Sequence, residues 1–442
     1  MTIIKIMHDP NFDFDINLSE ISKVEGAASL EIKVRNKKIE DLKFFISEWK
    51  RFYTQAIQGK PAAAVPQLVA RICGTCSNAH LLCSIKAIEN AFNISPSVQT
   101  MLLRKLLYFG LIIRDHALHL YVFALPDIYH KNSILDFDEN DPGQKQLLED
   151  TFAVKEVGNQ ISIIVGGRSV HAPNPTIGGF FKLPKLEDLK NLRPKLIEIR
   201  PKILNLIDIF AKTPFELKPK NQPSFSSLFS DDFSFLTGMI KNSDGKTIAE
   251  NEFNNYLEAV IIPYSQARGF RLNGNLLMVG ALARLNLAKQ NLHSKTKKDL
   301  SNYLNLFPSN NIFHNNLAQA IEILHVIDTS IDIIDSLNEI AEEKPAKITF
   351  KESTGIGVIE APRGTLYHQY NIDAQGLVKK AEIIVPTGQN QILMEKGIFE
   401  QTERLLLQDA DKEKITQEAE KLIRAFDPCM SCASHFLKLK WR

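Results

Sequence analysis

The chain has 442 residues, of which 44% are hydrophobic and 24% are charged, with 53 Lys and Arg against 51 Asp and Glu. This length supports a large buried core and excludes a mini-protein that is held together mainly by disulfides. A net charge of +2 provides no overall basic field, so the composition argues against nucleic acid as a partner.

The predicted elements begin with alternating apolar and polar residues near the N-terminus. Two strands, Ala28–Val34 and Leu42–Ile46, flank a polar turn at residues 35–38. Apolar residues at helical spacing then predict four helices, the third of which contains Pro194 and Pro201 as breaks or kinks. The four helices are Ser77–Phe92, Val98–Ala124, Leu183–Ala211 and Leu317–Glu342.

The helix predicted at Val98–Ala124 is the most apolar long stretch of the chain. Its longest uncharged run, Leu106–Ile113, has eight residues, whereas a helix that spans a membrane needs about 20. We therefore expect a buried core helix and no transmembrane segment.

Loops and a second group of strands complete the predicted organisation. The residue types of Asp138–Lys145 and Pro219–Asp244 are typical of loops. A helical middle between strands predicts an α+β fold that is predominantly α-helical, with a long-helix core, small β-sheets near both ends, and a single domain over residues 1–442. The late strands are predicted at Lys347–Phe350, Gly357–Glu360, Thr365–Asn371 and Leu377–Val385.

Five cysteines carry most of the functional information. Their number is odd, and the start of the chain, Met1–Pro10, lacks the apolar core of a signal peptide. We therefore expect a cytoplasmic protein, in which paired cysteines are more often metal ligands or redox groups than disulfides. The five are Cys73, Cys76, Cys83, Cys429 and Cys432.

Four of these cysteines form two Cys-x2-Cys pairs, at residues 73–76 and 429–432, which lie 353 residues apart. A zinc finger places its second pair about 12 to 20 residues after the first, so this separation favours a catalytic soft-metal centre in a prebuilt cavity. A structural four-cysteine zinc protein is the alternative. His80 and His435 each follow a pair, where an imidazole either hydrogen-bonds a thiolate, ligates the metal or is an ordinary polar group near a helix start.

The first pair lies in Arg71-Ile-Cys-Gly-Thr-Cys-Ser-Asn-Ala-His80 and the second in Asp427-Pro-Cys-Met-Ser-Cys-Ala-Ser-His435. These segments resemble the two signature motifs of the large subunit of nickel-iron hydrogenases. Residues 360–371 and 386–390 look most like the cytoplasmic multi-subunit type, which is linked to NAD(P) or a deazaflavin. Further motifs match in the order of the family: KVEG at 23–26, DHALH at 115–119, LPD at 125–127, GGRSVH at 166–171, EAPRG at 360–364 and VPT at 385–387.

The resemblance implies the large-subunit fold and a cysteine-ligated metal pair. Cys73 and Cys429 would be terminal nickel ligands, and Cys76 and Cys432 would bridge nickel to an iron that carries cyanide and carbon monoxide. Four thiolates suit a soft, electron-rich metal pair. The remaining cysteine, Cys83, has no place in the motif, and we interpret it as a buried free thiol.

The resemblance also implies that the chain cleaves H2 heterolytically and reversibly. Cys429 would take the proton first and pass it to Glu25, which out of this context would be an ordinary surface carboxylate. Arg363 matches an anionic cyanide ligand or polarises bound hydrogen, and Asp115 and Asp427 would hold its guanidinium over the metals.

Three further residues would surround the diatomic ligands of the iron. Pro362 would present an apolar wall, the Thr387 hydroxyl would donate to the second cyanide, and His80 would lie beside the thiolates. Outside this motif context, Ala-Pro-Arg-Gly is an ordinary turn with a solvated arginine, and Asp427 is a helix cap.

A second, hard metal ion such as magnesium is in doubt. His435 matches one of its side-chain ligands in the family, but Thr54 stands where a glutamate is usual, and a neutral hydroxyl is a weaker ligand for a hard cation. Only Phe436–Arg442 follow the motif histidine, so we expect no proteolytic processing or a very short trim.

The partners follow from the electrons that H2 oxidation releases. Four cysteines at one site leave one, which is too few to ligate an iron-sulfur cluster. The resemblance implies an iron-sulfur small subunit, further diaphorase-type subunits that bind NAD(P) or a deazaflavin, and maturation factors. The alternatives on the same fold are a sulfur reductase and a hydrogen sensor.

Overall fold

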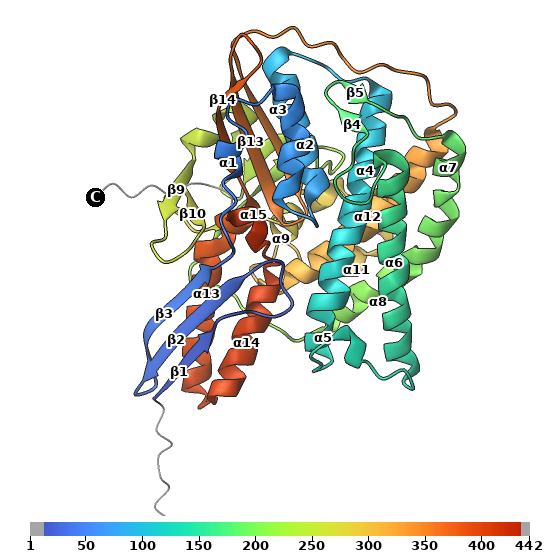
Figure 1. The fold of residues 1–442 in the computed structure, drawn as a ribbon. Coiled ribbons are helices and arrows are strands. Elements are labelled where there is room, and N and C mark those ends of the chain that lie inside the picture. The colour runs from blue at the N-terminus through green and yellow to red at the C-terminus, as the bar shows by residue number, and fades with distance from the viewer. Residues whose placement is uncertain (1–12, 435–442) are drawn as a thin grey trace, which may run out of the picture.

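The computed structural model describes residues 13–434. Long helices pack together on one side of the molecule, at the right in Figure 1, where α4 packs against α6 and α12, and α12 packs against α8. Their side chains belong to one extensive cluster of buried apolar residues, which also includes the four paired cysteines. The long helices are α4 (Val98–Ala117), α6 (Pro142–Gly166), α8 (Leu192–Lys212) and α12 (His314–Ser336).

Helix α4 continues through a π-helical stretch, Leu118–Ala124, into α5 (Leu125–Ile128). Within the described residues, the run Val98–Ile128 is the one helix long and apolar enough by composition to cross a membrane, with a mean hydropathy of 1.2. Because 83% of this apolar window is buried inside the protein, its side chains pack in the core, as expected for a core helix.

A three-stranded antiparallel sheet lies against α3 (Ser77–Phe92), the helix that follows the first cysteine pair (Figure 1). Two glycines of its first strand permit the close approach, because a Cβ at Gly355 or Gly357 would lie 1.9 Å or 2.4 Å from a backbone carbonyl oxygen of α3. The strands are β12 (Ser353–Ala361), β13 (Gly364–Ile372) and β14 (Val378–Ile384), in that order.

Early and late segments of the described chain meet at the N-terminal sheet, which has the order β1-β2-β3. Its strands β1 (Phe14–Leu18), β2 (Ala28–Arg35) and β3 (Lys38–Ile46) are antiparallel, and their apolar side chains pack against late helices. These helices are α13 (Pro386–Leu407) and α14 (Lys412–Ala425), which lie beside the sheet in Figure 1 and are followed by α15 (Met430–Ala433). This packing brings the second cysteine pair next to the N-terminal segment.

Short strands and helices connect these layers. A sheet of order β11-β6-β7-β8 and a β9–β10 hairpin follow α8. The short strands are β4 (Pro175–Thr176), β5 (Gly179–Phe180), β6 (Ser224–Phe229), β7 (Met239–Asn242), β8 (Thr247–Ile248), β9 (Leu257–Ile261), β10 (Arg268–Leu272) and β11 (Leu277–Met278). The short helices are α1 (Tyr53–Ala56), α2 (Val65–Val69), α7 (Leu186–Lys190), α9 (Ala281–Ala288), α10 (Ser294–Asp299) and α11 (Ser301–Leu304).

Two of the predicted loops and one predicted strand differ from the structure. The predicted loop Pro219–Asp244 contains β6 and β7, since their pairing with each other and with β11 and β8 overrides its turn-forming composition. The predicted loop Asp138–Lys145 ends where α6 begins at Pro142, with Asp141 as its N-cap. The predicted strand Lys347–Phe350 forms no strand, because no neighbouring strand is paired with it.

Candidate metal centre

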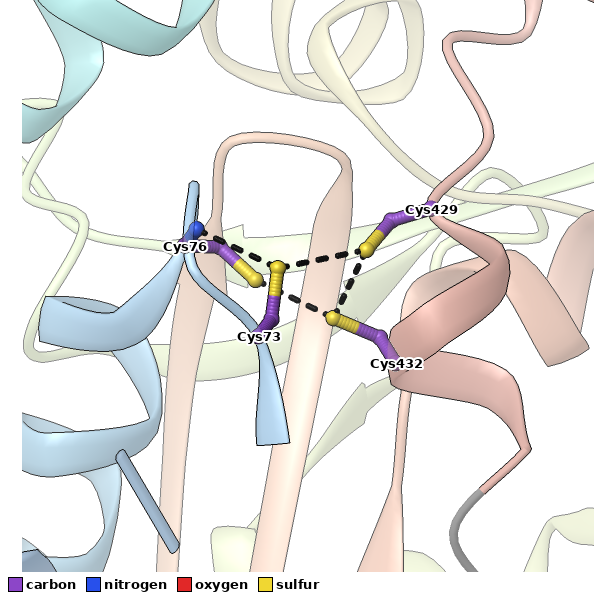
Figure 2. Close-up of side chains that lie close together, drawn as sticks. All are labelled: Cys73, Cys76, Cys429 and Cys432. Carbon is purple, nitrogen blue, oxygen red and sulfur yellow. Dashed lines mark hydrogen bonds between the residues drawn. The ribbon is translucent and has the colours of Figure 1, made fainter. Parts of the chain in front are cut away.

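The four paired cysteines meet in one buried cluster (Figure 2). All four sulfur atoms lie within 4.8 Å of one another, and none forms a disulfide. Cys73 Sγ lies 3.4 Å from Cys429 Sγ, and Cys76 Sγ lies 3.1 Å from Cys432 Sγ, so each sulfur of the first pair faces one of the second. Buried thiols in this arrangement suit soft metal ions.

Local backbone geometry aims each pair at the cluster. Cys73 is extended after the 3-10 turn at residues 70–72, and Cys76 is the N-cap of α3, so the two-residue turn between them directs both sulfurs inward. Cys429 is the N-cap of the short helix α15, and Cys432 lies one turn further along it. The second pair is held against the N-terminal segment, where Glu25 and Cys429 form an isolated β-bridge.

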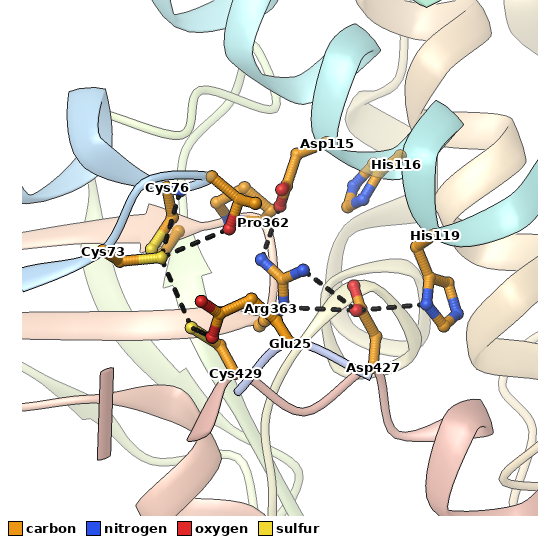
Figure 3. Close-up of polar contacts among 12 residues, drawn as sticks. Glu25, Cys73, Cys76, Asp115, His116, His119, Pro362, Arg363, Asp427 and Cys429 are labelled. Atoms are coloured by element: carbon orange, nitrogen blue, oxygen red, sulfur yellow. Dashed lines mark hydrogen bonds and ion pairs between the residues drawn. The ribbon is translucent and has the colours of Figure 1, made fainter. Parts of the chain in front are cut away.

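Glu25 reaches the cluster through this bridge (Figure 3). Its Oε2 accepts a hydrogen bond from Cys429 Sγ at 2.9 Å and one from the Ser431 N–H at 3.3 Å. Its backbone carbonyl accepts from the Met430 N–H at 2.8 Å. The carboxyl group is therefore in direct contact with one candidate metal ligand.

Arg363 also lies beside the cluster, at the tip of the β12–β13 hairpin (Figure 3). Its Nη1 donates to Asp115 Oδ2 at 2.6 Å, and its Nε donates to Asp427 Oδ1 at 3.1 Å. Nη2 lies 3.1 Å from the same Asp427 oxygen but makes no hydrogen bond, although it is buried. The guanidinium thus keeps donor capacity for a further acceptor.

A small cavity is lined by Cys76, Cys429 and Cys432, together with Arg363 and Pro362. Thr387 lines it at the start of α13, where its hydroxyl oxygen accepts a hydrogen bond from the Cys429 N–H at 2.9 Å. The hydroxyl hydrogen therefore remains available to a group in the cavity. His80 also lines the cavity, and its Nδ1 lies 3.1 Å from Nε2 of His368.

Burial governs the protonation of the groups around the cluster. Desolvation raises the pKa of Glu25 above its ordinary value, and the same effect lowers the pKa of His80 to about 4. Burial also raises the pKa of Asp115. For Asp427, burial is outweighed by the Arg363 guanidinium and by His119, which hold the pKa of that carboxyl well below its usual range.

The predicted site residues are brought together, apart from those of the second metal. The four cysteines, Glu25, Arg363 and the two aspartates lie around the cluster, and Pro362, Thr387 and His80 line its cavity. His435 and the tail Phe436–Arg442 lie outside the described residues. Thr54 is buried on α1, and its hydroxyl donates to the neighbouring Gln55 side chain.

Several residues of the site were not singled out from the sequence. His119 Nδ1 lies 3.1 Å from Asp427 Oδ1, and the Gln319 side chain donates to the other oxygen of that carboxylate at 2.8 Å. The sequence did carry a signal for His119. It follows Asp115 by four residues, which places both side chains on one face of a helix. His368 carried no such signal, because only the strand pairing places it beside α3.

The chain is related throughout its length to known proteins. The family model described as nickel-dependent hydrogenase matches residues 51–149 and 230–435. Sulfhydrogenase 2 subunit alpha of Pyrococcus furiosus is 33% identical over 425 residues, which cover 96% of this chain and 100% of the relative. Sulfhydrogenase 1 subunit alpha of the same organism is 31% identical over 441 residues, which cover 97% and 100%.

The fold of the chain is similar to that of solved hydrogenase structures. An NAD+-reducing [NiFe]-hydrogenase solved in its H2-reduced state superimposes with a TM-score of 0.82 at 22% sequence identity, covering 96% of this chain and 100% of that one. A Ni-Fe-Se hydrogenase from D. vulgaris Hildenborough matches with a TM-score of 0.75 at 19% identity.

Proposed function

This chain belongs to the nickel-dependent hydrogenase family and is an oxidoreductase acting on H2, and from this premise we propose the roles of its individual residues. The observation that carries the proposal is the cluster of four buried thiols, drawn from early and late segments of the chain, with Glu25 and Arg363 beside it. A structural zinc site would not require a carboxyl group and a partly unsatisfied guanidinium beside it.

We propose that Cys73 and Cys429 are terminal ligands of nickel, and that Cys76 and Cys432 bridge nickel to iron. The donor set fits this pair, because four thiols meet in one cluster, and three of them line a small cavity together with Arg363, whose Nη2 keeps donor capacity, and the Thr387 hydroxyl. Cyanide and carbon monoxide on the iron would occupy that cavity. When bound, the metal pair supplies the heterolytic cleavage of H2, which releases two protons and two electrons in total.

The protein's own residues handle the protons. Cys429 Sγ accepts the first proton and passes it to Glu25 Oε2, which lies 2.9 Å away. Burial, which raises the pKa of Glu25, supports its ability to hold a proton before releasing it outward.

The remaining residues orient and enclose the site. Asp115 and Asp427 hold Arg363 from two directions, so that its guanidinium is fixed against the cavity without free rotation. Pro362 and His80 line the same cavity, where a donor-free ring and a neutral imidazole exclude water. We also propose a magnesium site formed with His435, which Thr54 weakens because it offers a hydroxyl in place of a carboxylate ligand.

Electrons must leave through another protein. We propose an iron-sulfur small subunit as the direct partner, with diaphorase-type subunits that bind NAD(P) or a deazaflavin beyond it, and with maturation factors that insert the metals. The names of the relatives, which are alpha subunits, and the fold of the NAD+-reducing hydrogenase support this assembly. We assign residues 1–442 to one domain in the cytoplasm, which suits five cysteines without a disulfide.

Elemental analysis and infrared spectroscopy of the purified complex test this proposal. We expect nickel, with iron in excess of nickel because the iron-sulfur subunit adds its own iron, together with cyanide and carbonyl stretches. Zinc without these bands would refute the nickel-iron assignment. As a control, Cys83→Ala should retain metals and bands, because Cys83 is buried away from the cluster and donates to the carbonyl of Gly357.

Sulfur reduction by the same complex is a second candidate activity. It is favoured by the two Pyrococcus relatives, which are named sulfhydrogenases. Hydrogen sulfide production from polysulfide under H2 would support it, and H2-dependent reduction of NAD(P) without sulfide would argue against it.

A further inference from the structure

Arg284 is a fully buried arginine that none of the roles above uses. It lies on α9, is 2% exposed and makes hydrogen bonds with all five of its N–H groups. Burial of a cation is costly unless it is paired and fully hydrogen-bonded, so this arrangement calls for a structural or functional reason.

Two carboxylates from different elements hold the guanidinium. Glu322 on α12 accepts a fork from Nε at 2.6 Å and from Nη2 at 2.7 Å. Glu360 on β12 accepts from Nη1 at 2.7 Å, and its other oxygen accepts from the Thr365 hydroxyl and the Leu228 N–H. The guanidinium therefore has a single orientation.

The two remaining N–H groups point to the backbone of the hairpin tip. Nη1 donates to the carbonyl of Ala361 at 3.1 Å, and Nη2 donates to the carbonyl of Pro362 at 2.9 Å. Ala361 pairs with Gly364 across the hairpin, so the two residues between them, Pro362 and Arg363, form the loop. Arg284 thus binds the peptide groups immediately before Arg363.

The start of α9 contacts the other side of the same tip. A Cβ at Gly364 would lie 2.5 Å from a methyl group of Val279, and a Cβ at Gly280 would lie 3.1 Å from the Arg363 carbonyl oxygen. Both glycines have positive φ, +133° and +114°. One element therefore both packs against the tip and donates hydrogen bonds to it.

We propose that Arg284 is a positioning residue, which fixes the Pro362–Arg363 loop so that Arg363 and Pro362 face the four thiols. This inference rests on the proposed roles of Pro362 and Arg363 at the cavity. Two sets of contacts then orient Arg363. Asp115 and Asp427 hold its side chain, and Arg284 holds the backbone that carries it.

Arg284→Lys tests the proposal, because it keeps the charge and removes the fork. In the purified complex we expect the infrared bands of the cyanide ligands to shift and broaden. In the metal-free full chain we expect hydrogen exchange at the three amides of residues 361–364, those of Ala361, Arg363 and Gly364, to become about tenfold faster, the factor that corresponds to about 1.4 kcal/mol.

Arg104→Lys is the matched control. Arg104 is also buried and also donates a fork to a carboxylate, that of Glu89, but its remaining bond goes to Thr176, outside the cavity lining. It should perturb stability and leave the cyanide bands and the exchange of residues 361–364 as in the wild type. If Arg284→Lys does not fold, Glu322→Gln, which weakens the anchor of Arg284 without removing its shape, should give smaller changes in the same direction.

The outcomes separate this inference from the proposed function. Wild-type bands and unchanged exchange at residues 361–364 in the folded Arg284→Lys or Glu322→Gln variant would overturn the positioning role. Absence of cyanide bands in the wild-type complex would instead contradict the nickel-iron assignment, and the exchange measurement alone would then decide whether Arg284 holds the loop.

Discussion

At the scale of single residues, the environment of Glu25 distinguishes it from an ordinary carboxylate. Its side chain contacts Cys429 Sγ, and burial raises its pKa. An isolated glutamate in a sequence is usually solvated, so the motif predicted a contact that the residue type alone would argue against. The contact exists because the N-terminal segment forms a bridge with the last cysteine motif.

Glu25→Gln should keep the metals and abolish proton transfer, since an amide preserves the shape but cannot accept and release a proton. We expect H2/D2O isotope exchange to fall about 100-fold or more. Metal analysis should be unchanged. Glu20→Gln, a change at an exposed carboxylate five residues earlier, is the control. Full exchange activity in Glu25→Gln would eliminate Glu25 as the proton relay.

Arg363→Lys should retain the cation but lose the fork that two aspartates hold. Each charge-assisted hydrogen bond contributes about 1.5–3 kcal/mol, so the loss of one corresponds to about a ten- to hundredfold lower turnover. Turnover with saturating H2, together with the cyanide bands, measures this. Unchanged turnover and bands would show that a point charge suffices at this position.

At the scale of elements, periodicity predicted some segments closely and others not at all. The helix Ser77–Phe92 is observed with the predicted bounds, because its apolar face repeats regularly and Asn93, in the left-handed region, ends it. The helix predicted at Leu317–Glu342 is found at His314–Ser336. By contrast, β6 and β7 were predicted as loop, since strand formation there depends on packing against the paired strands and not on the local residue types.

The contact between α3 and β12 has a sharp steric requirement. Gly357→Ala would place a Cβ 2.4 Å from the carbonyl oxygen of Cys83 and 2.7 Å from the amide nitrogen of Ala87, and neither backbone atom can move without moving the helix. We expect a loss of about 1–3 kcal/mol or more in the free energy of unfolding. Denaturant unfolding of the metal-free chain measures it.

Thr354→Ala in the same strand is the control for this change. Thr354 is exposed, and its loss should alter stability by about 0.5 kcal/mol or less. Because α3 begins directly after Cys76 and β12 leads to Pro362, Gly357→Ala should also lower metal content, whereas Thr354→Ala should not. Equal stability of the two variants would contradict the packing argument.

At the scale of the whole molecule, the metal centre joins two cysteine pairs that lie 353 residues apart in the sequence. The first pair lies before α3 and the second at the end of the described chain, and their sulfurs meet within 4.8 Å. Metal ions that bind only the folded arrangement stabilise it by mass action. Metal bound by the four cysteines should therefore increase the free energy of unfolding of the whole chain as well as support catalysis.

Removal of the metals should accordingly lower Tm by several degrees. We expect Cys73→Ser to reduce the difference between the loaded and metal-free forms towards zero, whereas Cys83→Ala should preserve it, because only the former removes a ligand. Scanning calorimetry of both forms of each variant measures this. An identical Tm with and without metals in the wild-type chain would show that the cavity is rigid by itself.

The sequence by itself determined the donor set, the helix-rich fold class and the family, because cysteine spacing, apolar period and local motifs are properties of neighbouring residues. Tertiary structure alone decided which atoms meet: the Glu25–Cys429 bridge, the two aspartates on Arg363, and the hold of Arg284 on the hairpin tip. These contacts join segments tens to hundreds of residues apart. They depend on packing of whole layers, whose outcome no local pattern encodes.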